Sequence, residues 1–133
     1  MNPGHASIRQ ADASHLPRHG HRALAKIDPV NSLNADLHSH STASDGTLDA
    51  STLAARAKAN GVELWALTDH DELSGLPAAR AAAAAAGLPF VDGIEVSVTF
   101  ANLTVHIVGL GIDPANDELE AGIAGVRDRK SVV

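Results

Sequence analysis

The sequence predicts an α/β fold assembled from parallel βα units, and two observations lead to this class. From Asn34 onward, short strand-like apolar runs alternate with longer segments of helical period, in the order β-α-β-α-β-β-α. Hydrophobic residues make up 44% of the 133 residues but aromatic residues only 2%, so the core should be aliphatic and rich in helix. A chain of this length forms one domain or a piece of one.

The first two βα units are predicted between Asn34 and Gly75. Apolar side chains at helical spacing favour a helix after the first strand, with Asp49 or Ser51 as its cap and Gly61 as its stop. The second strand should be buried, because most of its residues are apolar. In chain order we expect a strand at 35–38, a polar loop at 39–46, a helix at 48–60, a strand at 62–68 and a polar loop at 69–75.

The second half of the pattern predicts a helix, a β-hairpin and a last helix. Pro77 suits the first turn of the helix and Gly87 its end, and the alanine run between them strongly favours helix. Ala101 and Asn102 are expected to form the turn of the hairpin. In chain order we expect a helix at 76–86, a strand from 88 to 95, β runs at 96–100 and 103–110, and a helix at 115–126.

The two ends of the sequence do not follow this pattern. Residues 1–33 show no regular period and are predicted to be a disordered extension, in which the His19 and His21 pair is not expected to bind metal. Residues 128–133 depart from the expected continuation of the last helix and match one translation frame of a common sequencing adapter. We therefore expect a non-native tail at 128–133 and a folded domain at 34–127.

Residue types that can bind divalent metals follow the predicted strands. In a βα-barrel the carboxyl ends of the strands share one face, so these residues should lie on the same side of the fold. His38 and His40 alternate on an extended backbone, so their imidazoles should point the same way, roughly 6–7 Å apart. Glu95, expected at the end of the third strand, offers two oxygens and can bridge two ions. Each residue alone is a weak signal, but their coincidence in four separate loops predicts a metal site, and the ligand types suit zinc, manganese or iron. The predicted ligands are His38, His40, Asp45, His70, Glu95 and His106.

Composition and missing motifs exclude several other classes of function. There are no cysteines, so the chain has no disulfides, thiolate zinc sites or cysteine nucleophiles. The sequence contains no Walker-type phosphate loop, nucleophile elbow or dinucleotide fingerprint. No apolar run reaches the ~18 residues needed to cross a membrane and no secretory signal is evident, so we expect a soluble cytoplasmic protein without an obligate protein partner. The formal charge of −6 disfavours nucleic-acid binding unless bound cations reverse the local field.

Five segments of the sequence resemble motifs of the PHP (polymerase and histidinol phosphatase) superfamily. They are residues 36–40, 44–46, 67–71, 93–97 and 105–110, and the similarity covers roughly residues 34–127. The combination is most similar to the bacterial branch with nucleoside 3′,5′-bisphosphate phosphatases and 5′-3′ exonucleases that act on short RNA. This resemblance implies the N-terminal part of a distorted, seven-stranded (β/α) TIM-like barrel.

The resemblance also implies a centre of up to three divalent ions (manganese, zinc or iron) that hydrolyses phosphate esters. His38, His40 and Glu95 would hold the first ion, and Glu95 would bridge to a second that His106 also binds. Asp45 and His70 would hold the third, while Asp69 would orient an imidazole from behind the ligands. The implied substrate is a nucleotide bisphosphate or the 5′ end of a short oligonucleotide.

Two later motifs of the superfamily are missing from this sequence. One supplies a further histidine and the other an Asp-x-His pair, and four strands cannot close a barrel. We therefore predict an N-terminal fragment with exposed apolar faces, poor independent stability and little or no activity. Two alternatives stay open: a small-molecule phosphatase of the histidinol phosphatase type, and a non-catalytic metal-binding module like the PHP domains inside larger polymerases.

Overall fold

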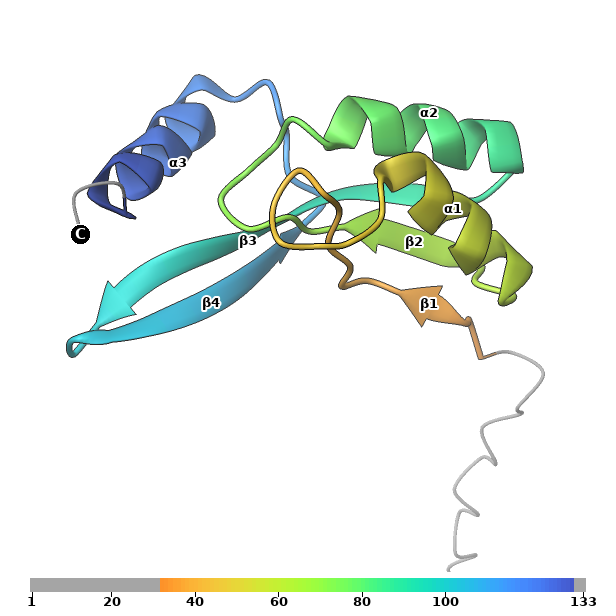
Figure 1. The fold of residues 1–133 in the computed structure, drawn as a ribbon, viewed down its shortest axis with the longest axis horizontal. Helices are drawn as coiled ribbons and strands as arrows, with labels where there is room; N and C mark the ends of the chain where they lie inside the picture. Colours follow the sequence, from red (N-terminus) through yellow and green to blue (C-terminus); the bar gives the residue numbers. More distant parts are fainter. Residues whose placement is uncertain (1–31, 131–133) are drawn as a thin grey trace, which may run out of the picture. The chain divides into compact units, whose positions relative to one another are not determined.

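The computed structural model describes residues 32–130, and these contain four strands and three helices in the predicted order. The predictions for residues 1–31, including the His19 and His21 pair, and for residues 131–133 lie outside the described part. The predicted α/β class is confirmed. The elements are β1 (Ala35–Asp36), α1 (Ala50–Ala59), β2 (Leu64–Leu67), α2 (Leu76–Ala86), β3 (Phe90–Phe100), β4 (Leu103–Leu110) and α3 (Asp117–Lys130) (Figure 1).

One mixed sheet carries this part of the chain, with its strands in the order β1-β2-β3-β4. The first three strands are parallel, and β4 returns antiparallel to β3. Helices α1 and α2 connect the parallel strands and lie next to each other on one face of the sheet (Figure 1). Because parallel strands end at the same edge, the loops after β1 and β2 meet beside the middle of β3.

Small side chains on α1 and α2 allow both helices to pack closely on β2. Leu67 is fully buried and Trp65 is 1% exposed, with its ring 5.1 Å from that of Phe90. Gly87 ends α2 in the left-handed conformation (φ 60°), as predicted. The predicted aliphatic, helix-rich core is confirmed, with Trp65 as its one large aromatic member. The core residues are Ala50, Ala54, Ala57, Trp65, Leu67, Leu76, Ala79, Ala83 and Leu88.

Strand β3 is continuous from Phe90 to Phe100, so the predicted break after Glu95 is wrong. The strand serves two ladders in turn: its first part pairs with β2 as far as Asp92, and its second part pairs with β4 from Gly93 onward. Where the pairing with β2 ends, β4 provides hydrogen-bond partners for the backbone of β3, so the strand continues without a turn. The predicted hairpin turn is confirmed, with Ala101 and Asn102 at φ 49° and 64°, as two-residue hairpins of this type require.

Helix α3 begins two residues later and ends four residues later than predicted, at Asp117 and Lys130. Asn116 precedes it, and its side-chain oxygen accepts the N–H of Leu119, which caps the first turn. At the other end, the Lys130 ammonium lies 2.7 Å from the buried carboxylate of Asp71, and this ion pair holds the last turn in place. The non-native origin of residues 128–133 stays a prediction.

Strand β4 exposes apolar side chains, as the sequence analysis predicts. It forms one edge of the described sheet, and no other strand within residues 32–130 pairs with its outer side. No helix in this range is long and apolar enough to cross a bilayer. The large exposed apolar residues of the hairpin are Phe100, Leu103, Val105, Ile107, Val108 and Leu110.

The cap of α1 gives a first testable prediction. Asp49 accepts the N–H of Thr52 at 2.7 Å, and this hydrogen bond holds the pKa of Asp49 below its ordinary 3.8. A lowered pKa means that the stabilisation is complete above the unfolded value and is lost as pH falls through the folded one. We expect Asp49→Ala to lower the melting temperature at pH 7, with the difference from wild type shrinking below about pH 4. Asp49→Asn keeps an acceptor oxygen and is the control; a difference that does not change with pH would contradict a role for the charge.

Candidate metal centre

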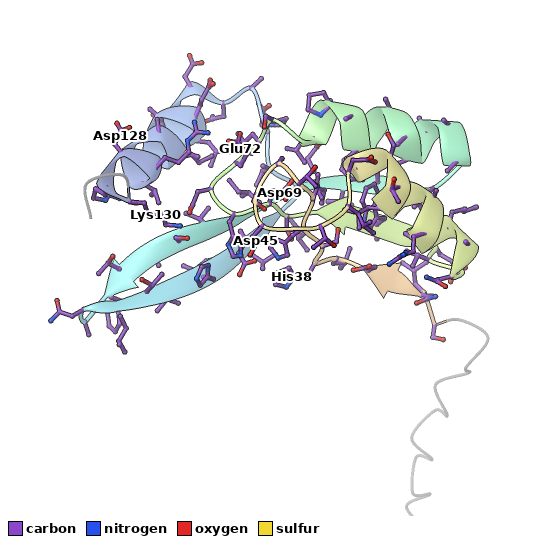
Figure 2. The ribbon with its side chains drawn as sticks, viewed as in Figure 1. His38, Asp45, Asp69, Glu72, Asp128 and Lys130 are labelled. Atoms are coloured by element: carbon purple, nitrogen blue, oxygen red, sulfur yellow. The ribbon has the colours of Figure 1, made fainter. Side chains whose placement is uncertain are left out.

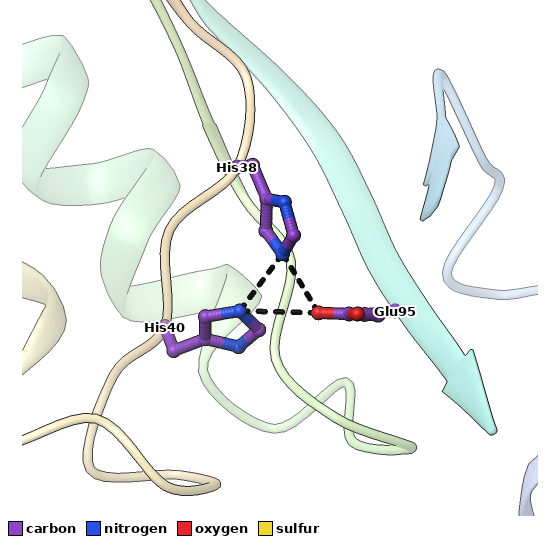
Figure 3. Close-up of side chains that lie close together, drawn as sticks. All are labelled: His38, His40 and Glu95. Carbon is purple, nitrogen blue, oxygen red and sulfur yellow. Dashed lines mark hydrogen bonds and ion pairs between the residues drawn. The ribbon is translucent and has the colours of Figure 1, made fainter. Parts of the chain in front are cut away.

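His38 and His40 lie in the loop after β1, which ends at Asp36 and is shorter than the predicted strand. Their Nε2 atoms are only 3.0 Å apart, closer than the extended backbone predicts (Figure 3). Ser39 between them turns inward: its hydroxyl donates to the carbonyl of Ala66 at 2.8 Å and accepts the indole N–H of Trp65 at 2.9 Å. With the serine anchored on the opposite side, both imidazoles point to one place.

Glu95 lies at the centre of the cluster, in the middle of β3 and not at the strand end that the sequence predicts. It is 7% exposed, and its Oε2 is 2.7 Å from Nε2 of His38 and 3.1 Å from Nε2 of His40 (Figure 3). The same oxygen is 3.7 Å from Nε2 of His70, and Oε1 is 3.7 Å from Nδ1 of His106. Both carboxylate oxygens therefore face imidazole nitrogens.

His70 and Asp45 come from two different loops and meet on the other side of His40. Asp45 places one oxygen 3.5 Å from Nε2 of His70 and the other 3.6 Å from Nδ1 of His40. The rings of His40 and His70 are stacked with centroids 4.6 Å apart. In Figure 2, Asp45 and His38 lie where the loop after β1 passes over the middle of the sheet. All six predicted ligand residues thus come together.

The six residues form three overlapping donor groups, in each of which one donor atom per residue lies within 4.8 Å of the others. The first group has the composition that the resemblance implies. The second and third contain the implied pairs and add His40 and His70, respectively. The groups are His38, His40 and Glu95; His40, Asp45 and His70; and His70, Glu95 and His106.

The surrounding imidazoles keep the Glu95 carboxylate charged. Burial raises the pKa of Glu95, but the hydrogen bond from His38 and the charges of His70, His38 and His40 lower it further than burial raises it. The pKa of this carboxyl therefore lies below its ordinary value. An ionised carboxylate among imidazoles is a suitable donor for a divalent cation.

The donor atoms fit a divalent cation in two further respects. A cation bonded at about 2.1 Å to two donors at right angles holds them about 3.0 Å apart. The separations of 2.7, 3.0 and 3.1 Å among His38, His40 and Glu95 are close to this value. In addition, Nδ1 of His40 and Nδ1 of His70 are buried without a hydrogen-bond partner in the described part of the chain. Orphaned buried nitrogens are rare unless something binds them.

Asp69 forms no hydrogen bond or ion pair with an imidazole among residues 32–130, and its expected role in orienting one stays a prediction. Its carboxylate accepts hydrogen bonds from Ser41 and Ser44, because the loop after β1 folds over it. Asp71, for which the sequence predicts no role of its own, is 2% exposed at φ 49° and accepts the N–H of Ser97 at 2.7 Å. No local signal marks it, because its partner is 26 residues away.

Residues 36–120 match the family model of the PHP domain. Several curated relatives carry names with a stated activity, among them a phosphatase and an exoribonuclease. A 3′,5′-nucleoside bisphosphate phosphatase from Chromobacterium violaceum is 54% identical over 95 residues, which cover 71% of this chain and 33% of that protein. A 5′-3′ exoribonuclease from Haemophilus influenzae is 43% identical over 86 residues, covering 65% of this chain and 31% of that protein. The chain thus spans about a third of the length of these relatives.

Solved structures agree with the sequence matches. An amidohydrolase from Chromobacterium violaceum, solved with bound sulfate and no metal, superposes with a TM-score of 0.71 at 52% identity, covering 73% of this chain and 34% of that one. A protein from Bifidobacterium adolescentis, provisionally described as a metal-dependent phosphoesterase, superposes with a TM-score of 0.69 at 31% identity, again over 73% and 34%.

Proposed function

Because this chain belongs to the PHP domain family and its fold is part of a TIM-like barrel, as predicted, we propose that it supplies the metal centre of a metal-dependent phosphoesterase. The observation that carries the proposal is the convergence of four imidazoles and two carboxylates, from two loops and from strands β3 and β4, into three donor groups. The buried, unpartnered nitrogens of His40 and His70 point to the same use.

We assign the ligands as the resemblance implies, with up to three ions of manganese, zinc or iron. His38, His40 and Glu95 hold the first ion, and Glu95 and His106 hold the second. Asp45 and His70 hold the third, although His40 faces this group through its Nδ1 atom. The donor set contains no thiolate, which favours metals that accept nitrogen and oxygen ligands.

Divalent cations bound here supply Lewis acidity to a phosphoryl group and to a water molecule. The chain's own residues hold these charges in place. Glu95 is buried and ionised, and its negative charge offsets the positive charge of the centre. The imidazoles of His38 and His106 line the exposed side of the centre, with side chains 52% and 41% exposed. A phosphate ester can therefore reach the centre from the side that these two histidines border.

Nucleotide bisphosphates and the 5′ ends of short oligonucleotides are the proposed substrates. The names of the two curated relatives support both. The chain itself carries a formal charge of −6, so bound cations are needed to attract a polyanion to this face. We also propose that residues 34–127 form the PHP portion of the chain; the family match at 36–120 supports these bounds. A cytoplasmic location stays a prediction.

The proposal is tested in two proteins. The first is the 133-residue chain with His5, His15, His19 and His21 replaced by Asn, called the reference chain below, which removes four competing imidazoles from metal titrations. The second is a full-length chimera, in which residues 34–127 replace the matching part of the Chromobacterium violaceum relative. We expect the reference chain to retain metal after desalting. The chimera should hydrolyse adenosine 3′,5′-bisphosphate and a 5′-phosphorylated trinucleotide, lose this activity with a chelator, and regain it with Mn²⁺.

The outcomes separate the alternatives. Preference of the chimera for histidinol phosphate would favour the small-molecule phosphatase. Metal binding without hydrolysis of any ester would favour the non-catalytic module. A reference chain that binds no divalent metal, together with a chimera whose activity survives His38→Ala, would overturn the assignment.

A further inference from the structure

We propose that Asp69 is a positioning residue, which fixes the loop at residues 41–46 and thereby places Asp45 beside His40 and His70. This inference rests on the proposed metal centre and adds a residue that does not itself touch the ions. It predicts that one donor group, the one that contains Asp45, depends on a buried carboxylate behind it. Figure 2 shows Asp69 beneath the loop that carries Asp45.

The Asp69 carboxylate accepts hydrogen bonds from two residues of the loop and thereby fixes its conformation. It is 2% exposed and accepts three short hydrogen bonds: from the N–H of Ser41 at 2.7 Å, from the hydroxyl of Ser41 at 2.7 Å, and from the hydroxyl of Ser44 at 2.6 Å. No Lys, Arg or His side chain among residues 32–130 forms an ion pair with it. The three bonds tie Ser41 and Ser44, at the start and in the middle of the loop, to one buried carboxylate.

The space around this carboxylate is filled, which leaves the loop little freedom. A Cβ atom on Gly75 would lie 2.8 Å from the Asp69 carboxylate and 3.2 Å from the hydroxyl of Ser41. The loop also closes on itself, because the carbonyl of Ser41 accepts the N–H groups of Ser44 and Gly46. Asp69 and the loop are therefore held together by close packing and hydrogen bonds.

Asp45 has few contacts of its own that could fix its position. Its side chain is 67% exposed, and its distances of 3.5 and 3.6 Å to His70 and His40 exceed those of good hydrogen bonds. The backbone of the loop thus decides where this carboxylate lies. Glu95 differs, because it is buried in a strand that is paired with β4 along its second half.

The backbone of Asp69 forms a separate hydrogen bond, which a substitution of the side chain leaves intact. Its carbonyl accepts the N–H of Glu95 at 3.1 Å, which keeps His70 and Glu95 in register. Changing the carboxylate should therefore disturb the Asp45 group and spare the group of His38, His40 and Glu95.

The test measures bound Mn²⁺ in the reference chain and its variants by equilibrium dialysis and elemental analysis. Asp69→Asn keeps the size of the side chain, but an amide N–H replaces the oxygen that accepts the hydroxyl of Ser41, so this hydroxyl has to turn and accept instead. We expect the weakest Mn²⁺ to lose affinity by about 10–100-fold while the tightest ion changes by no more than about twofold. Asp92→Asn is the matched control, because this carboxylate on β3 pairs with Arg80 and does not contact the loop.

Two further variants keep the inference testable if Asp69→Asn does not fold. Ser44→Ala removes the 2.6 Å hydrogen bond to Asp69, together with a longer one of 3.5 Å to Asp45, and should weaken the same ion. Ser44→Thr retains the hydroxyl and should restore the affinity. In an Asp45→Asn background, Asp69→Asn should have no additional effect on affinity, since Asp69 acts through Asp45.

The results distinguish this inference from the proposed function. A reference chain that binds no Mn²⁺ contradicts both. If the reference chain binds Mn²⁺, equal losses at every ion, or a lower melting temperature with an unchanged titration, would overturn the positioning role alone. An effect of Asp69→Asn that persists undiminished in the Asp45→Asn background would do the same.

Discussion

Glu95→Gln should weaken Mn²⁺ binding by the reference chain at least about 100-fold, the largest effect of any single ligand. Glu95 belongs to two of the three donor groups and faces four imidazole nitrogens. The substitution removes a negative charge from the middle of the centre and turns an amide group toward the imidazoles. The measurement is a competition titration against a fluorescent chelator.

Glu63→Gln provides the matched control for this experiment. Glu63 is an exposed carboxylate that accepts the N–H of Asn34 at 2.9 Å and lies outside the three donor groups. Its replacement should leave Mn²⁺ affinity within about twofold. Equal affinities for Glu95→Gln and Glu63→Gln would mean that the metal, if bound, lies elsewhere.

Gly46→Ala should lower the free energy of unfolding by about 3 kcal/mol, because the added methyl group distorts the loop that carries Asp45. A Cβ atom at this position would lie 2.1 Å from the carbonyl oxygen of His40 and 2.8 Å from the carbonyl carbon of Ser41. These are backbone atoms, so no side-chain rotation relieves the overlap. Because His40 is a proposed ligand, Mn²⁺ affinity should fall together with the free energy of unfolding in urea.

Gly122→Ala tests the same chemical change where there is room for it. Gly122 lies in α3, and a Cβ atom there meets nothing within 4 Å. Alanine in a helix interior is favoured over glycine by about 1 kcal/mol, so this variant should be slightly more stable, with unchanged Mn²⁺ affinity. If Gly46→Ala were as stable as Gly122→Ala, the close approach of the loop to His40 would be contradicted.

The sequence identifies the candidate ligands because their positions follow from the order of strands. Parallel strands end at one edge, so ligand-type residues that follow each strand must meet, as His38, His40 and His70 do. The alternation of apolar runs likewise locates α2 to the residue, since Pro77 and Gly87 mark its ends. These features depend on local chemistry, which the sequence contains directly.

Features that depend on distant contacts could not be predicted. Glu95 lies in mid-strand because β4 pairs with β3 where β2 stops, and no local pattern distinguishes this from a strand end. Spacing alone places His38 and His40 near each other but does not reveal the side-chain conformations that bring their nitrogens to 3.0 Å. The role of Asp69 depends on hydrogen bonds to residues 25 and 28 positions earlier. The extra turn of α3 depends on the ion pair between Lys130 and Asp71, which lies in the loop after β2.

X-ray absorption at the zinc K edge of the zinc-loaded reference chain tests the shared metal centre most directly. We expect nitrogen and oxygen neighbours at about 2.0–2.1 Å, with the outer-ring scattering of at least two imidazoles at the tightest ion. In the 133-residue chain that keeps its four N-terminal histidines, replacing His38, His40, His70 and His106 together by Asn should abolish the imidazole signal of the tightest ion. A signal that persists in that variant, or a reference chain whose bound zinc shows no imidazole scattering, would contradict the account.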